Sequence, residues 1–209
     1  MKKLPDEIKK LYNFLSLADS VYINLRWRLC PFTLMEQFLP KKGIIIDVGC
    51  GYGLLANLIA LNSVERNVYG FDLSRRRIDI AKRTIRNRNK LHFELKNVRD
   101  LKLNSCDAIV MSDFLHHIPY KEQENLIRQA KDKLKKSGIL IIQDIDKKPL
   151  SKYLFAAALD NLLNFFPRLY YREANSFKNM LERNSFNVSV VRADKKLPLP
   201  DVLFICKKM

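Results

Sequence analysis

The chain has 209 residues, of which 47% are hydrophobic and 29% charged, and 38 basic against 22 acidic side chains give it a formal net charge of +16. This composition is typical of a globular protein with a sizeable core and excludes a disordered chain. No run approaches the ~18 consecutive apolar residues of a membrane span, and the N-terminal sequence MKKLPDE does not resemble a signal peptide. The four cysteines form no Cys-x-x-Cys pair, so we expect reduced thiols, no metal site and a cytoplasmic protein.

Residues 6–39 are predicted to be helical, because apolar residues recur there at helical spacing. Pro31 and Pro40 divide this region into pieces, since proline interrupts a helix. We therefore expect residues 1–40 to form an N-terminal helical cap.

Short apolar runs alternate with helical patterns from residue 41 onward. Strands are predicted over residues 43–49, 67–72, 91–95, 106–113 and 139–145, and helices over residues 54–62, 74–89 and 121–136 with a stop at Gly138. Such alternation indicates right-handed crossovers and a doubly wound parallel sheet.

The pattern changes after Lys148. An apolar, aromatic helical insertion is predicted at about 149–171 and a helix at 173–184. Two further strands, 187–193 and 201–208, are joined by a linker too short for a helix, which favours an antiparallel return. The predicted fold of residues 41–209 is therefore one α/β domain with five parallel strands and a C-terminal hairpin that contains an antiparallel strand.

The loop GCGYG, residues 49–53, follows the first strand directly, at the edge where ligands bind in parallel sheets. It departs from the dinucleotide motif because Leu54 stands at the third glycine position, and no Gly-Lys-Ser/Thr follows as a phosphate loop requires. Asp47 would repel a pyrophosphate but suits a ligand with a positive charge or an amine. Asp72 ends the second strand, where an acid accepts hydrogen bonds from ribose hydroxyls. Asp47 and the glycine spacing disfavour a nicotinamide dehydrogenase.

Five motifs extend this pattern: DVGCGYG, VYGFDLS, NVRDL, DAIVMSDFLHHIP and LKKSGILII. In their order and spacing, residues 43–146 resemble the class I S-adenosylmethionine-dependent methyltransferases, and most of all the group that acts on quinones, lipids and other small molecules. The resemblance implies a Rossmann-like methyltransferase sheet and S-adenosyl-L-methionine as the cofactor. It also implies O- or N-methylation of a small hydrophobic or amphiphilic acceptor.

The resemblance also implies roles for individual residues. Asp47 would anchor the methionyl amino group and Asp72 the ribose hydroxyls, while Leu73 would flank the adenine. Asn97 stands where the family usually has an aspartate, so either Asn97 or Asp100 would face the adenine amino group. The glycines would let the backbone approach the ligand. The complete expected cofactor set is Asp47, Gly49, Cys50, Gly51, Gly53, Asp72, Leu73, Asn97, Val98, Asp100, Ser112 and Asp113.

Two adjacent histidines, His116 and His117, follow the fourth strand at the same edge. Methyl transfer to a hydroxyl or a protonated amine needs a general base, a task that histidine performs near neutral pH. Adjacent residues in such a loop rarely both face inward, so we expect one of them to act. The alternative is that the pair only packs and hydrogen-bonds the loop. His92 is predicted at the opposite edge of the sheet.

The acceptor is the least determined feature. The aromatic segments 19–32 and 149–171 are expected to roof the pocket, and their basic flanks favour a lipid-like acceptor met at an anionic membrane face. Residues 75–102 carry eleven basic and three acidic side chains, 11 − 3 = +8. This favours an RNA methyltransferase as the alternative, although the Asn/Asp-Pro-Pro-Tyr/Phe motif of amino-methylating nucleic-acid enzymes is missing. A non-catalytic S-adenosylmethionine-binding module is a further alternative, and the oligomeric state stays open.

Overall fold

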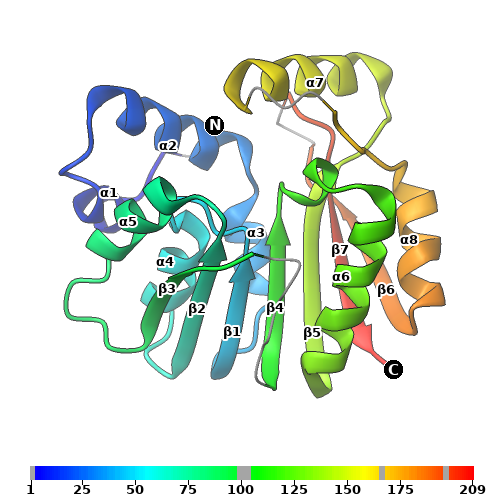
Figure 1. The fold of residues 1–209 in the computed structure, drawn as a ribbon, viewed down its shortest axis with the longest axis horizontal. Coiled ribbons are helices and arrows are strands. Elements are labelled where there is room, and N and C mark those ends of the chain that lie inside the picture. Colours follow the sequence, from blue (N-terminus) through cyan, green and yellow to red (C-terminus); the bar gives the residue numbers. More distant parts are fainter. Residues whose placement is uncertain (1–2, 98–104, 165–167, 195–197) are drawn as a thin grey trace.

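The computed structural model describes residues 3–97, 105–164, 168–194 and 198–209. Its seven strands form one sheet in the order β3-β2-β1-β4-β5-β7-β6 (Figure 1). Strands β1 to β5 run parallel, and β7 is antiparallel to both β5 and β6. The predicted doubly wound sheet with a C-terminal hairpin is therefore confirmed. The strands are β1 (Gly43–Val48), β2 (Arg66–Asp72), β3 (Leu91–Leu95), β4 (Cys106–Ser112), β5 (Leu134–Ile145), β6 (Phe186–Arg192) and β7 (Asp201–Lys208).

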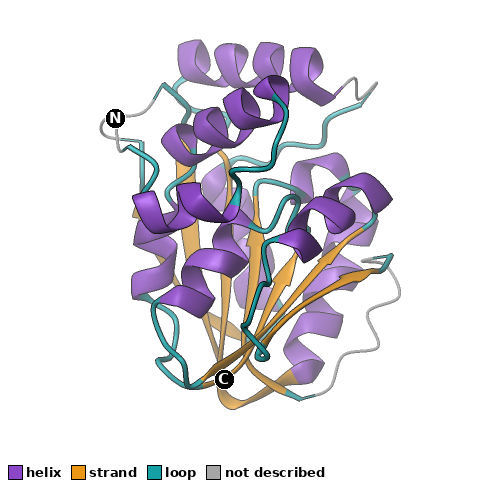
Figure 2. Cartoon of the chain, turned by 90° about the vertical axis from the view of Figure 1, so that its left-hand side faces the viewer, coloured by secondary structure: helices purple, strands orange, loops and turns teal. Residues whose placement is uncertain are grey.

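Helices cover both faces of the sheet (Figure 2). One buried cluster joins the N-terminal helices, α4 and α5 to one face, and a second joins α6 and α8 to the other. Among the described residues, no helix is both long and apolar enough to span a membrane. The helices are α1 (Asp6–Leu11), α2 (Leu17–Leu29), α3 (Phe32–Gln37), α4 (Leu54–Leu61), α5 (Arg75–Arg83), η2 (Leu115–His117), α6 (Tyr120–Lys133), α7 (Leu150–Asn164) and α8 (Ala174–Arg183).

Helices α5 and α6 end earlier than predicted. Helix α5 ends at Arg83 rather than 89, because the Thr84 hydroxyl donates to the Ala81 carbonyl at 2.6 Å and Arg86 adopts a positive φ of 50°. Helix α6 ends at Lys133, since the next residue, Leu134, is already extended and begins β5. The predicted helix stop at Gly138 is therefore wrong, and this glycine lies inside a long strand.

The N-terminal helices are fixed to the sheet domain by polar contacts. The Tyr12 hydroxyl donates to the Tyr52 carbonyl at 2.8 Å, and the Asn57 amide donates to the Tyr12 hydroxyl at 2.9 Å. Trp27 is buried on α2, with its ring centroid 5.8 Å from that of Phe32. Helices α1 to α3 thus share one core with the sheet rather than lying on its surface.

Three arginines of the basic segment after β2 contact this N-terminal region. Arg76 pairs with Asp19 at 2.6 Å, and the Arg83 guanidinium lies 3.7 Å from the centroid of the Phe14 ring. Arg86 donates to a carbonyl of the same region, that of Lys10. Part of the unusual charge of this segment is therefore used inside the fold.

The glycine loop offers a matched pair of substitutions for the free protein. Gly53 has φ +79°, and a Cβ there would lie 2.6 Å from the Phe93 ring, whereas Gly51 has φ +55° with nothing within 4 Å. We expect Gly51→Ala to cost about 1–2 kcal/mol through backbone strain alone. Gly53→Ala should cost about 2–4 kcal/mol, because overpacking adds to that strain. Urea unfolding of both variants measures the difference, and equal losses would contradict it.

Candidate active site

A cavity of about 380 Å³ lies where β1, β2 and β4 end. This volume is in the range of small-molecule sites. The parallel topology places the residues that follow these three strands at one edge, which accounts for the assembly of the site. Ten of the predicted site residues line the cavity: Asp47, Gly49, Cys50, Gly51, Asp72, Leu73, Asn97, Ser112, Asp113 and His117.

The other predicted site residues are Gly53, Val98, Asp100 and His116. Gly53 packs against Phe93 instead of facing the cavity. Val98 and Asp100 are outside the described residues, so the choice between Asn97 and Asp100 at the adenine stays a prediction. His116 is fully buried behind the cavity wall.

The two histidines lie in different environments. Nδ1 of His116 is 2.5 Å from Oδ1 of Asp144, and the imidazole lies between His117 and Tyr171 at ring distances of 4.1 and 4.6 Å. His117 is the member of the pair that lines the cavity. The expectation that only one of the two faces inward agrees with this arrangement.

The Asp72 carboxylate connects the glycine loop to β2. Its Oδ2 accepts the Gly51 backbone N–H at 2.9 Å, and its Oδ1 accepts the Ser74 N–H at 2.8 Å. Space for close approach of a ligand exists at Gly51, whereas a Cβ at Gly49 would meet the Phe114 ring at 2.9 Å. Gly49 therefore makes room for a side chain of the protein while it also lines the cavity, and its approach to the ligand stays a prediction.

Asp47 is a buried acid with an unsatisfied oxygen. Only 1% of the residue is exposed, and Oδ2 has no hydrogen-bond partner among the described residues. Burial, and then the charge of Asp72, raise the pKa of Asp47 to about 7, against a weaker opposing hydrogen bond from the Ala56 backbone. A ligand that brings a positive charge or an N–H donor would satisfy this oxygen.

The N-terminal helices supply residues that the sequence analysis did not single out. Tyr22 and Arg26 of α2 and Phe32 of α3 line the cavity, as do Phe114 and Ile118 after β4. The only sequence signal was the aromatic, arginine-rich character of segment 19–32. Its helical register had to be known before single residues could be assigned.

No described side chain of α7 lines the cavity. The helix packs instead in a small separate cluster, where Ala156 joins Leu29 of α2 and Tyr171. The expectation that the apolar insertion roofs the pocket is therefore not met by its described part.

Arg26 forms an ion pair with Asp113 at the end of β4. Asp113 has a positive φ of 52°, a backbone conformation that aspartate tolerates better than most residues. Burial alone would raise the pKa of Asp113, but the Arg26 guanidinium and the neighbouring histidines outweigh burial and lower it to about 2. The pair joins α2 to the sheet across the cavity.

The raised pKa of Asp47 has a measurable effect on stability. Since it lies above the unfolded value, the folded state holds the extra proton between about pH 4 and 7, and stability falls as pH rises through that window. We expect Asp47→Asn to stabilise the free protein at pH 8, by up to about 4 kcal/mol, and to do so much less at pH 5. Urea unfolding at both pH values measures this.

Asp107→Asn is the control for this experiment. Burial alone would raise the pKa of Asp107, but Lys135 and the Ile44 backbone N–H outweigh burial and lower it. The carboxylate of Asp107 therefore stabilises the fold above that pKa. This variant should lose stability at pH 8. A gain in Asp107→Asn, or no pH-dependent gain in Asp47→Asn, would contradict the electrostatic description.

Comparisons with known proteins agree with this geometry. A family model described as a methyltransferase domain matches residues 24–190. The ubiquinone biosynthesis O-methyltransferase of Haemophilus ducreyi is 29% identical over 132 residues, which cover 59% of this chain and 54% of that protein. An uncharacterized methyltransferase of Bacillus cytotoxicus is 27% identical over 172 residues, 76% of this chain and 77% of the relative. The chain thus spans about half the length of the ubiquinone enzyme that it matches.

Solved structures show the same fold. An O-methyltransferase family protein from Burkholderia thailandensis gives a TM-score of 0.74 at 16% identity, covering 91% of this chain and 58% of that chain. A protein from Pyrococcus horikoshii gives a TM-score of 0.71 at 16% identity, and the match covers 99% of this chain and 100% of that chain. Together with the family model, which spans most of the sequence, these matches place the chain in the methyltransferase domain family, as a class I S-adenosylmethionine-dependent methyltransferase.

Proposed function

We propose that the protein transfers a methyl group from S-adenosylmethionine to a hydroxyl group on a small acceptor with an apolar, planar body. The observation that carries this proposal is the mixed lining of the cavity. Asp47 and Asp72 line it together with His117 and the aromatic side chains of Tyr22 and Phe114. The name of the ubiquinone O-methyltransferase relative supports a small hydroxylated acceptor.

The cavity residues fit the cofactor. The unsatisfied Oδ2 of Asp47 suits the methionyl ammonium group, and the fixed carboxylate of Asp72 suits the ribose hydroxyls. Leu73 is 67% exposed beside the cavity, where an adenine ring would cover it. Asn97 offers an amide oxygen to the adenine amino group.

When bound, S-adenosylmethionine would supply an electrophilic methyl group. The acceptor oxygen would bond to this carbon through a lone pair, and the electrons of the broken carbon–sulfur bond would stay on the sulfur. Phe32, Phe114 and Ile118 exclude water from the acceptor and hold its body in place. We assign the acceptor proton to Nε2 of His117, because Nδ1 of this ring is buried. His116, held by Asp144, fixes the loop that carries His117.

Replacing the base tests this assignment. His117→Ala should lower turnover roughly 10²–10⁴-fold, because general-base assistance is lost. The affinity for S-adenosylhomocysteine should change by no more than about twofold, since His117 makes no assigned cofactor contact. His92→Ala is the matched control: this ring is bonded to Asn67 and stacked on Tyr69, away from the cavity. Equal loss of turnover and cofactor affinity in His117→Ala would make the residue structural.

The reaction itself is tested by incubating the full chain with S-adenosylmethionine and, separately, a catechol, a quinol, a simple phenol and total RNA. Formation of S-adenosylhomocysteine with a hydroxylated aromatic supports the proposal. Turnover with RNA alone would favour the RNA methyltransferase. Tight binding of S-adenosylhomocysteine without turnover on any of the four would favour the non-catalytic module.

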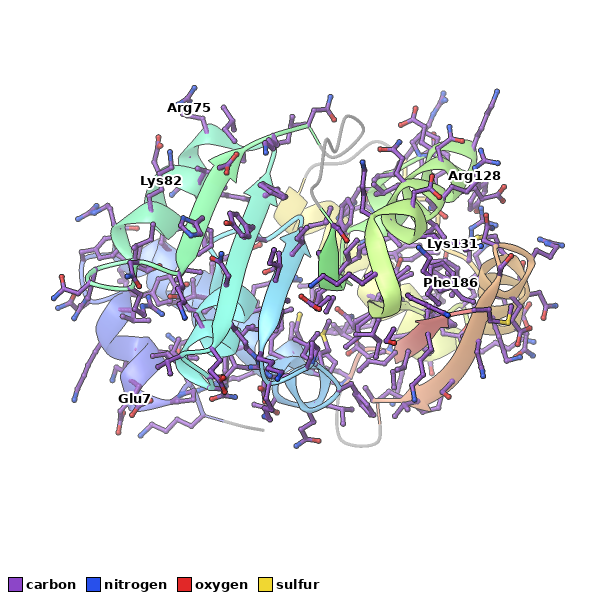
Figure 3. The ribbon with its side chains drawn as sticks, turned by 90° about the horizontal axis from the view of Figure 1, so that it is seen from below. Glu7, Arg75, Lys82, Arg128, Lys131 and Phe186 are labelled. Carbon is purple, nitrogen blue, oxygen red and sulfur yellow. The ribbon has the colours of Figure 1, made fainter. Side chains whose placement is uncertain are left out.

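The net charge of +16 is what favours the RNA alternative. Arg75 and Lys82 of α5 and Arg128 of α6 point away from the body of the protein (Figure 3). However, Arg76 and Arg83 of the same basic segment contact the N-terminal helices. This internal use of arginines supports the small-molecule proposal over RNA.

A peripheral contact with an anionic membrane is proposed alongside this activity. Three large apolar side chains of α7 are exposed: Leu150 by 63%, Leu154 by 58% and Phe155 by 50%. Lys147 and Lys148 precede them at exposed positions, and Lys148 pairs with Glu173 at 2.6 Å. Figure 1 shows α7 above the strand ends, on the side where the cavity residues lie. An apolar helix face with basic residues beside it suits the interface of an anionic bilayer.

Vesicle sedimentation measures this contact. The protein should bind vesicles that contain phosphatidylglycerol and bind neutral phosphatidylcholine vesicles much less, and Leu154→Glu should weaken binding about tenfold or more because it places a charge in the apolar face. Val64→Glu is the control, since Val64 is 83% exposed just before β2, at the opposite end of the strands. Equal loss in both variants, or equal binding to both lipids, would contradict this contact.

A further inference from the structure

The loop that carries the two histidines is held by one buried side chain of α6. Gln123 lies in the first turn of this helix, only 1% of the residue is exposed, and it does not line the cavity. Its Nε2 donates to the Leu115 carbonyl at 3.0 Å and to the Ile118 carbonyl at 2.9 Å. Since Leu115 and Ile118 flank His116 and His117 in the chain, one amide group binds the loop on both sides of the histidines.

The same amide group also binds the chain between α7 and α8. Nε2 of Gln123 donates to the Tyr170 carbonyl at 3.0 Å, and the Tyr170 N–H donates to the His116 carbonyl at 2.7 Å. Two N–H hydrogens thus serve three carbonyls, which is possible when one hydrogen is shared between two acceptors. Gln123 therefore joins the histidine loop to a second segment that lies against it.

Arg172 fixes the orientation of the Gln123 amide. Its Nε donates to Oε1 of Gln123 at 2.7 Å, and a guanidinium has no accepting atom. Oε1 must therefore face Arg172, so that the N–H hydrogens face the carbonyls. The guanidinium is held in turn by Tyr120, whose ring centroid lies 4.7 Å away and whose carbonyl accepts from Nη2 at 3.2 Å. Both polar atoms of the buried Gln123 side chain thus have partners, and its conformation is fixed.

The direction of the His117 ring depends on the backbone of this loop. The single turn η2 has short-range support only from the His117 N–H, which donates to the Phe114 carbonyl at 3.1 Å, and from the Ile118 N–H, which donates to the Leu115 carbonyl at 2.9 Å. One turn of this kind is not rigid alone. Because His117 faces the cavity and its neighbour His116 does not, a rotation of the backbone would move the His117 ring relative to the acceptor. A general base must stay within hydrogen-bond reach of the proton that it takes.

We propose that Gln123 is a positioning residue for methyl transfer, which holds η2 so that the His117 ring faces the acceptor. Gln123 contacts neither ligand and acts through His117. This inference rests on the proposed role of His117 as the base and is independent of how the cofactor is bound. It predicts that loss of the amide group lowers turnover, leaves cofactor binding unchanged and has no further effect once the His117 ring is absent.

NMR spectra of the imidazole groups test the structural half of this proposal without an acceptor. The chain has three histidines, so single alanine variants assign their signals. Gln123→Met removes the amide group and nearly keeps the length of the side chain. It should change the chemical shift and the titration curve of His117, and it should leave those of His92 as in wild type. An unchanged His117 signal in the folded variant overturns the proposal.

A double-mutant cycle tests the functional half. The assay uses S-adenosylmethionine with the catechol, quinol or phenol that supports turnover. Gln123→Met should lower turnover about 10- to 100-fold, the range for a small displacement of a catalytic group, and should change the affinity for S-adenosylhomocysteine by no more than about twofold. In the His117→Ala background the same substitution should lower turnover by no more than about twofold, because no ring is left to position. An equal fold-loss in both backgrounds overturns the proposal.

The controls use the same helix and the partner of the amide group. Gln129→Met, the same substitution at a half-buried position of α6, should behave as wild type in both experiments. If Gln123→Met does not fold, Arg172→Gln removes the contact that orients the amide group. This variant should then show the same pattern with a smaller loss of turnover.

The single variants separate the role of Gln123 from that of His117. If His117→Ala loses turnover and Gln123→Met does not, the base stands and the role of Gln123 is wrong. If His117→Ala turns over as wild type does, the base assignment is wrong, and the proposal for Gln123 is overturned with it.

Discussion

The rest of the site depends on two buried carboxylates at the ends of neighbouring parallel strands. Asp47 and Asp72 are both nearly inaccessible to water, and the charge of Asp72 adds to the burial that raises the pKa of Asp47 to about 7. Asp72 offsets its burial by accepting two backbone N–H groups, whereas one oxygen of Asp47 has no such partner. The protein thus maintains a polar site that is costly to fold and that a cationic ligand group would relieve.

The N-terminal helices complete the site that the sheet begins. Tyr52 of the glycine loop accepts a hydrogen bond from Arg76, donates one to Asp19 of α2, and meets the Tyr22 ring edge-on at 5.2 Å. Asp113 provides a second attachment through Arg26 on the other side of the cavity. Contacts on two sides hold α2 over the cavity, which links the position of the helix to the shape of the pocket.

The sequence was sufficient for the fold and for the strand-end residues, because apolar periodicity and parallel topology together determine which positions meet at one edge. It was insufficient for the ends of α5 and α6, where the Thr84 hydroxyl and the extended backbone at Leu134 decide the boundary. The direction in which a side chain points could not be predicted from the sequence either. Of two adjacent histidines, only the structure shows which one is held by Asp144 and which one faces the cavity.

The single tryptophan of the chain gives the N-terminal helices an optical signal of their own. Trp27 is the neighbour of Arg26 on α2 and is buried beside Phe32, another residue of that region. Its emission wavelength depends on the polarity around the indole and on its exposure to water. Intrinsic fluorescence therefore reports the packing of α2 against the sheet without a label, and separately from the unfolding of the strands that contain no tryptophan.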